Sequence, residues 1–224
     1  MRTKTLTTTE TESWRQLIGR ILELRQDDRG FRANVSRGLL TTTEYYAYPY
    51  VLPFAAHPGQ NQPLLRAAAL TAQHVKTAQY SPPASTNSDS EDPTAQRKWA
   101  GPMTLGRSFA LASRQLSPDG VFSDPSKPDA IAQRLRTLDQ QALDDAAVTI
   151  DRILTIGEKL ASPIPIDYYR LTRLLLRWGN GISPESLDVR RSIQREYYSG
   201  AAFIDTVLTS QANSAVAPTT QDTK

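Results

Sequence analysis

The stretch 170-RLTRLLLRWGNG-181 combines a run of leucines with regularly spaced arginines. At about 100° per residue, a helix here gathers its large apolar side chains on one arc: Leu171, Leu174, Leu175 and Trp178. A narrower arc beside it carries Arg170, Arg173 and Arg177. Two interpretations are open. Either the arginines are the solvated flank of a core helix, or a helix anchored by leucines presents a row of cations to an anionic partner.

Helical periodicity extends along most of the chain. It starts with Trp14, Leu17, Ile18 and Ile21, continues through the alanine-rich segment 63–80 and resumes at 101–116. Four more helices are expected at 130–138, 143–160, 167–178 and 184–199, the last with a possible extension over 201–208. No stretch shows the period-two alternation of a strand. The sequence therefore predicts an all-α fold.

Breaks in this periodicity define the expected organisation. Residues 81–96, SPPASTNSDSEDPTAQ, contain no large apolar side chain and are expected to form a mobile acidic loop in the N-terminal half. The break VFSDPSKPD at 121–129 is the candidate linker. We expect an N-terminal helical bundle at 1–120 and a C-terminal helical bundle at 121–224, which ends in a disordered tail.

Composition excludes several classes of protein. The chain has 224 residues, 39% of them hydrophobic, which is sufficient for a buried core. It has no cysteine, which excludes disulfides and thiolate metal sites and fits a reducing cytoplasm. No apolar run approaches the roughly 18 residues of a membrane span, and residues 1–14 do not form a secretory signal. We expect a cytoplasmic protein without membrane contact.

Enzymatic constellations are missing. His57 lies in a Pro/Gly segment and His74 on an otherwise ordinary helix, and neither has zinc-ligand spacing. Asp144, Asp145 and Asp151 are interpreted as the polar face of a helix. There is no phosphate-binding glycine loop and no paired nucleophile and base. We expect no catalytic residue, no metal and no cofactor.

Charge is distributed unevenly around a net value of +3. Arginine dominates the segments 14–37, 97–114 and 170–195, and its planar fork suits phosphate contacts. Arg107 and Arg114 are two helical turns apart on a helix without acids. The predicted nucleic-acid-binding residues are Arg32, Arg37, Arg97, Lys98, Arg107, Arg114, Arg173, Arg177, Arg190 and Arg191.

The pair of helices at 166–198 also has the outline of a helix–turn–helix. The second helix of such a unit reads bases with its N-terminal residues. Here those residues are PESLD, acidic and poor in base readers. Phosphate contact is therefore favoured over sequence reading.

The order of several motifs is similar to the CasB family, the small subunit of the type I-E Cascade complex in CRISPR interference. These motifs are DRGFRANVSRG, YPYVLPF, PLLRAAALTA, TLGRSFALAS, IDYYRLTRLLLRWG and VRRSIQREYY, and the resemblance runs from about residue 14 to 198. It implies an all-α fold of two bundles without catalytic activity. This chain departs from the family at the turn GNGISP, which is uncharged, and at the long acidic loop 81–96.

The resemblance also implies partners. Two copies would sit in a crRNA-bearing assembly, between its backbone filament and its large subunit. They would hold the guide–target region and line a basic groove for the displaced DNA strand, which stabilises the R-loop. Arg32, Arg37, Arg107, Arg114 and Arg177 fall in segments that match the family's basic regions. The alternatives are a helix–turn–helix regulator and a scaffold whose arginines meet acidic protein surfaces.

Overall fold

The computed structural model describes residues 8–80, 103–117 and 126–215, with side chains described for 13–80, 103–117 and 126–200. The first half contains α1 (Thr8–Leu24), α2 (Arg29–Ser36), α3 (Tyr48–Val51) and α4 (Asn61–Gln73), with the 3-10 turns η1 (Arg37–Leu39), η2 (Glu44–Tyr46), η3 (Leu52–Phe54) and η4 (Pro58–Gln60). The second half contains α5 (Leu105–Leu116), α6 (Ala130–Leu135), η6 (Leu138–Gln140), α7 (Leu143–Gly157), α8 (Tyr168–Leu176) and α9 (Pro184–Ala215). The predicted all-α class is confirmed.

Two short strands are a part of the described fold that the sequence did not predict, and the helical segment expected over 63–80 ends at Gln73, before the first of them. β1 (Ala78–Gln79) pairs in parallel with β2 (Pro165–Ile166), with Ala78 opposite Pro165. Strands of two residues are too short to show alternation, so no pattern indicated them. The pair ties the segment after α4 to the segment before α8.

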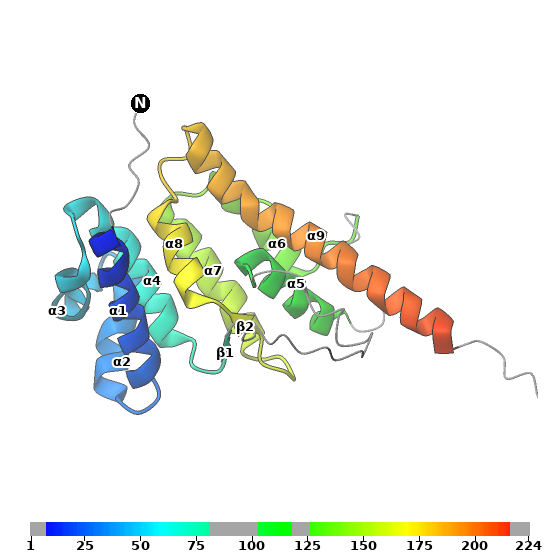
Figure 1. The fold of residues 1–224 in the computed structure, drawn as a ribbon, viewed down its shortest axis with the longest axis horizontal. Coiled ribbons are helices and arrows are strands. Elements are labelled where there is room, and N and C mark those ends of the chain that lie inside the picture. The colour runs from blue at the N-terminus through cyan, green and yellow to red at the C-terminus, as the bar shows by residue number, and fades with distance from the viewer. Residues whose placement is uncertain (1–7, 81–102, 118–125, 216–224) are drawn as a thin grey trace, which may run out of the picture.

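α4 is the central helix of the first half. Its residues from Leu64 to Ala72 are all buried, because α1 and α2 pack on it from one side and α7 and α8 from the other (Figure 1). α1 contributes the apolar residues that its periodicity predicted, among them Trp14, Leu17 and Ile21, each at most 1% exposed. Small alanine side chains on α4 allow these neighbours to approach closely.

α5 and α9 form the most extensive helix pair of the structure. α9 runs along one edge of the molecule, and α5 lies against it (Figure 1). The contact is close at Gly106, where an added Cβ would fall against the Ile193 carbonyl oxygen and 2.7 Å from the Tyr197 amide nitrogen. The side chain of the same Tyr197 reaches further along α5, where its hydroxyl lies 2.9 Å from that of Ser113.

This packing bears on the domain division. The predicted boundary at residue 120 lies outside the described residues, as do the loop at 81–96 and most of the predicted tail. α9 continues to Ala215, so the first part of that tail is helical. Because α5 packs mainly on α9, and one continuous apolar cluster runs through both halves, we propose that α5 belongs with the C-terminal bundle.

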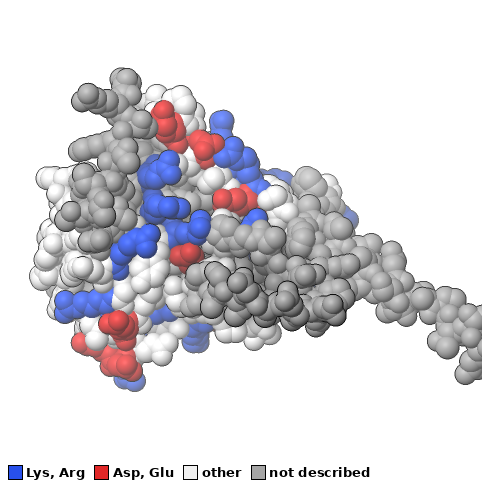
Figure 2. All heavy atoms as spheres, in the orientation of Figure 1, with Lys and Arg blue, Asp and Glu red and all other residues white. Residues whose placement is uncertain are grey.

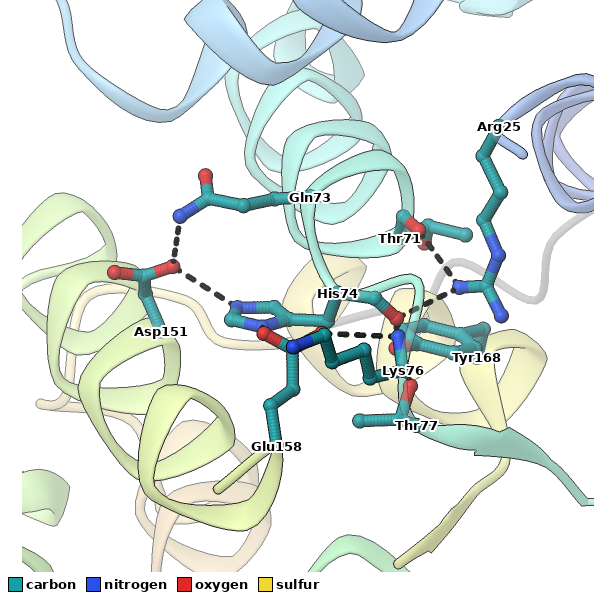
Figure 3. A network of polar contacts seen from close by, with 9 residues as sticks. All are labelled: Arg25, Thr71, Gln73, His74, Lys76, Thr77, Asp151, Glu158 and Tyr168. Atoms are coloured by element: carbon teal, nitrogen blue, oxygen red, sulfur yellow. Dashed lines mark hydrogen bonds and ion pairs between the residues drawn. The ribbon is translucent and has the colours of Figure 1, made fainter. Parts of the chain in front are cut away.

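His74 links α4 to α7 from a buried position (Figure 3). Its Nε2 lies 3.0 Å from Asp151 Oδ1, which also accepts a hydrogen bond from Gln73. Its Nδ1 lies 3.3 Å from Glu158 Oε2, close enough for an ion pair but without hydrogen-bond alignment. His74 is thus a structural residue, and α7 supplies the carboxylates that the sequence did not place beside it.

Arg25 and Tyr168 extend this network to α1 and α8 (Figure 3). Arg25 Nη1 donates to the Thr71 and His74 carbonyls at 2.9 and 3.2 Å, and the Tyr168 hydroxyl donates to the same His74 carbonyl. These bonds satisfy carbonyl groups at the C-terminal end of α4, which lack partners within the helix. They fix α8 against the first half of the molecule.

Candidate nucleic-acid interface

The arginine-bearing helix α8 is anchored as its pattern predicts. Asp167 caps it by accepting a hydrogen bond from the Arg170 amide at 3.0 Å. Leu171 and Leu175 are buried, and the buried Trp178 donates through Nε1 to the Gln141 carbonyl at 3.0 Å. Leu171 and Leu175 face the core, while the half-buried Leu174 lies at the surface beside the arginines.

The row of arginines lies along two adjacent hollows. The first, the α5–α8–α9 hollow, has a volume of about 220 Å³. The charged residues that line it are Arg170, Arg173, Arg177, Asp188 and Glu196. The α1–α8 hollow, of about 350 Å³, is lined by Trp14, Arg15, Gln79, Tyr80, Asp167, Tyr169, Arg170 and Arg173. Two arginines belong to both hollows, which makes them one continuous surface. Figure 2 shows lysine and arginine atoms gathered in a band over α8 and towards α1. We call Arg15, Arg170, Arg173 and Arg177 the arginine row.

Most acids near this row already have partners. Asp167 Oδ2 lies 3.3 Å from Arg170 Nε, and Asp188 Oδ1 lies 2.6 Å from Arg195 Nη2. Arg173 and Arg177 are exposed and form no ion pair with any described residue. Their charges are therefore available to an external anion.

Glu196 is the acid that most directly opposes the row. Burial raises the pKa of Glu196, while a hydrogen bond from Thr104 and the charges of Arg107 and Arg170 act to lower it. This carboxylate lines the same hollow as Arg177 and reduces the positive field there. The α5–α8–α9 hollow is thus less cationic than its three arginines indicate.

The structure separates the predicted residues of α5 from the arginine row. Arg107 is half-buried and acts on Glu196, and its amide is capped by Thr104. Arg114 is half-buried and donates to the Ser117 carbonyl at 3.2 Å, at the end of the helix. Neither lines the two hollows, so their nucleic-acid role stays a prediction.

Arg32 and Arg37 lie in the α2–η2 part of the first half, also away from the hollows. Arg32 Nη1 donates to the Arg25 carbonyl at 3.1 Å and closes the turn between α1 and α2. Arg37 is exposed and stacks its guanidinium 4.1 Å from the centre of the Tyr46 ring. The charge of Arg37 is therefore accessible beside aromatic rings, whereas the guanidinium of Arg32 is engaged in a hydrogen bond within the fold.

Arg190 is built into the turn between α8 and α9. It is 3% exposed, and its guanidinium donates to the carbonyls of Trp178, Gly179 and Asp139. Gly181 has a φ of +75°, and a side chain there would meet this guanidinium. Arg190 is therefore not part of the surface that we propose.

None of the three remaining predicted residues is found on the arginine row. Arg191 is exposed, with Nε 3.5 Å from Asp139 Oδ2, and lies outside both hollows. Arg97 and Lys98 lie outside the described residues. Of the predicted set, Arg173 and Arg177 are the pair that the structure brings together on one surface.

Sequence reasoning missed the contribution of α1 and the segment after β1. Arg15 reaches the arginine row from α1, and Gln79 and Tyr80 reach it through the strand pair. Helical spacing puts Trp14 and Leu17 on the buried side of α1 and Arg15 on its exposed side. Nothing in the sequence placed Arg15 beside α8. Tyr169, next to the row, was treated only as part of a helix.

Among the described residues, no group of three or more His, Cys, Asp or Glu could hold a metal ion. Asp144 accepts hydrogen bonds from Arg66 and Gln62 of α4, and Asp151 from Gln73. These carboxylates serve the α4–α7 contact. Within the same part of the chain, no helix is long and apolar enough to cross a membrane.

The fold and the surface together define a small helical protein that presents an arginine-lined face. Its sequence matches the family model of the CRISPR-associated protein Cse2 over residues 31–198. The chain belongs to this family.

Comparison of structures agrees on the fold. A chain titled "CRISPR RNA-guided surveillance complex" is 22% identical, with a TM-score of 0.57, covering 91% of this chain and 99% of that chain. Another, titled "CRISPR RNA-guided surveillance complex, pre-nicking", is 21% identical, with a TM-score of 0.58 and coverages of 90% and 98%. A comparison with curated proteins finds no significant match.

Proposed function

We propose that this protein is the non-catalytic small subunit of a crRNA-guided surveillance complex in the cytoplasm. It binds the nucleic-acid backbone without reading sequence and stabilises the R-loop. Membership of the Cse2 family carries the proposal, and the two similar chains named for such complexes support it. Its partners are the backbone filament and large subunit of the complex, a second copy of the chain, the crRNA and the two DNA strands.

The chemistry of the arginine row suits this role. Base pairing with the guide supplies sequence specificity, so the protein needs only contacts to phosphates. R-loop formation exchanges one duplex for another of similar stability, and a few cations are then enough to shift the equilibrium. Arg173 and Arg177, exposed and without acidic partners in the described part of the chain, supply such cations.

Of the two alternatives, the helix–turn–helix regulator has less support, and an experiment separates the scaffold. A helix–turn–helix regulator needs base-reading side chains on α9, but Arg190 is buried and Arg195 pairs with Asp188. A scaffold that only meets acidic protein surfaces fits the same arginines. Photocrosslinking from position 173 within the assembly separates the two roles, because a scaffold predicts crosslinks to protein alone.

The direct test is an add-back experiment. A cognate complex purified without its small subunit is assayed for R-loop yield with and without this protein. Stoichiometric incorporation with restored R-loop formation is the expected result. An otherwise competent complex that neither incorporates the chain nor regains R-loops contradicts the proposal.

A further inference from the structure

Exposed large apolar side chains gather in one short stretch of the first half. Among the residues with described side chains, seven large apolar ones are exposed, and four of these lie within residues 40–48. They are Leu40, Tyr45, Tyr46 and Tyr48, with exposed fractions between 38% and 53%. We call these four the tyrosine patch. Single exposed apolar residues are normal, but a local cluster is typical of a surface that binds another molecule.

The tyrosine patch is held in place by the fold. The ring centres of Tyr45 and Tyr46 lie 4.2 Å apart, and the Tyr48 hydroxyl donates to Glu44 at 2.9 Å. The fully buried Arg66 of α4 lies 2.7 Å from the same Glu44 and ties η2 to the central helix. Because the segment is already fixed, binding there costs little conformational entropy.

A pocket of about 290 Å³ adjoins the tyrosine patch and shares Tyr48 with it. We call it the Glu44 pocket, because Glu44 is the one charged residue of its lining. It has no lining residue in common with the two hollows of the arginine row. The residues that line it are Glu44, Tyr48, Leu52, Asn61, Gln62 and Leu65.

The charge balance at the Glu44 pocket is negative. Arg66 is a single cation between two carboxylates, those of Glu44 and Asp144, each at 2.7 Å. Gln62 of the pocket also donates to Asp144, whose side chain is 40% exposed. One net negative charge therefore lies beside apolar walls. The complementary group is a cation on an apolar stem, which is the side chain of lysine or arginine.

We propose that the tyrosine patch and the Glu44 pocket dock a different protein subunit of the complex. That subunit inserts a lysine or arginine side chain into the pocket and lays apolar side chains over the tyrosines. Arg37, whose guanidinium lies 4.1 Å from the centre of the Tyr46 ring, meets an acid of the same subunit at the rim. The inference rests on the proposed function, because it takes the occupant from the same assembly.

Charge favours this occupant over two others. The phosphates of a nucleic acid would meet the net negative charge of the Glu44 pocket, which opposes their binding. A symmetric pair of copies would bring two negative pockets to one interface. A protein surface that carries a basic side chain among apolar ones has neither disadvantage.

The test measures how tightly the full chain joins a cognate complex purified without its small subunit and immobilised for biolayer interferometry. Tyr45→Ser/Tyr46→Ser is expected to raise the Kd for joining about tenfold or more, because aromatic side chains dominate the binding energy of protein interfaces. Both side chains are exposed, so urea unfolding and affinity for a single strand should keep their wild-type values. Ile182→Ser, the matched control, removes an exposed apolar side chain outside the patch and should join like wild type.

A second pair of variants tests the charge of the pocket. Gln62→Lys places a cation beside the pocket and should weaken joining by up to about fivefold, the range of a surface charge pair. Gln62→Glu should not weaken it, because the pocket stays negative. Gln140→Lys adds the same cation at an exposed glutamine of η6 that does not line the pocket, and should join like wild type.

The outcomes separate this inference from the proposed function. A wild-type chain that fails to join an otherwise competent complex contradicts both. A wild-type chain that joins, with the tyrosine double variant and Gln62→Lys joining equally tightly, overturns the docking surface alone. Loss of single-strand affinity in the double variant would assign the patch to nucleic acid and overturn the inference. Self-association of the wild-type chain that the double variant lacks, seen by size-exclusion chromatography, would assign the patch to a second copy and overturn it as well.

Discussion

Neutralising Arg173 and Arg177 should halve the salt dependence of single-strand binding. Both residues are exposed and free of ion pairs with described residues, so each is expected to neutralise one phosphate. If all members of the arginine row do so, the logarithmic slope of affinity against salt is about −2.8, from about 0.7 per contact on a single strand. Affinity then falls about 50-fold between roughly 50 and 200 mM salt.

The double variant Arg173→Gln/Arg177→Gln should have a slope of about −1.4 and lose only about sevenfold over the same range. The assay is fluorescence anisotropy with a labelled single strand at several salt concentrations. Arg152→Gln, an exposed arginine of α7 that lines neither hollow, is the matched control and should keep the wild-type slope. An unchanged slope in the double variant, or an equal reduction in the control, would refute the assignment of this surface.

Three further predictions address the elements that build the surface. Glu196→Gln should strengthen strand binding, because it removes the carboxylate that opposes the arginine row. Because burial raises the pKa of Glu196, the ionised carboxylate disfavours folding near neutral pH, and the variant should be more stable there. The protonated wild-type carboxyl carries no such penalty, so thermal unfolding should show that this gain vanishes below about pH 4. Gly106→Ala should lower the free energy of unfolding in urea by about 2 kcal/mol, because the new methyl group meets the α9 backbone at Ile193. This steric cost exceeds the gain in helix propensity. An unchanged free energy of unfolding would contradict the close α5–α9 contact. Arg190→Ala should cost about 2–3 kcal/mol through unpaired buried carbonyls yet leave the salt slope unchanged, and a reduced slope would return this residue to the interface.

The fold class and the anchoring of α8 could be predicted because they depend on local periodicity. Leu171, Leu175 and Trp178 are buried, and Arg173 and Arg177 are exposed, as a single helical arc predicts. The sequence could not distinguish these arginines from Arg190. All three occur on amphipathic helices, but only the packing of α9 against the preceding turn brings Arg190 to the carbonyls that bury it.

The sequence could not predict which residues lie beside the arginines of α8. Trp14, Gln79 and Tyr169 are brought together by long-range packing of α1, the strand pair and α8. His74 shows the same limit, since Asp151 and Glu158 reach it from α7, far along the chain. A pattern read along one helix identifies its exposed side, but not what the neighbouring elements add to it.

The central claim is that the arginine row stabilises the R-loop in the assembled complex. It is tested most directly by R-loop yield from a complex lacking its small subunit, reconstituted with wild-type chain, Arg173→Gln/Arg177→Gln or Arg152→Gln. We predict that all three chains incorporate equally and that only the double variant gives a reduced yield, with a deficit that grows with salt. A fully incorporated double variant with wild-type R-loop yield would contradict the account.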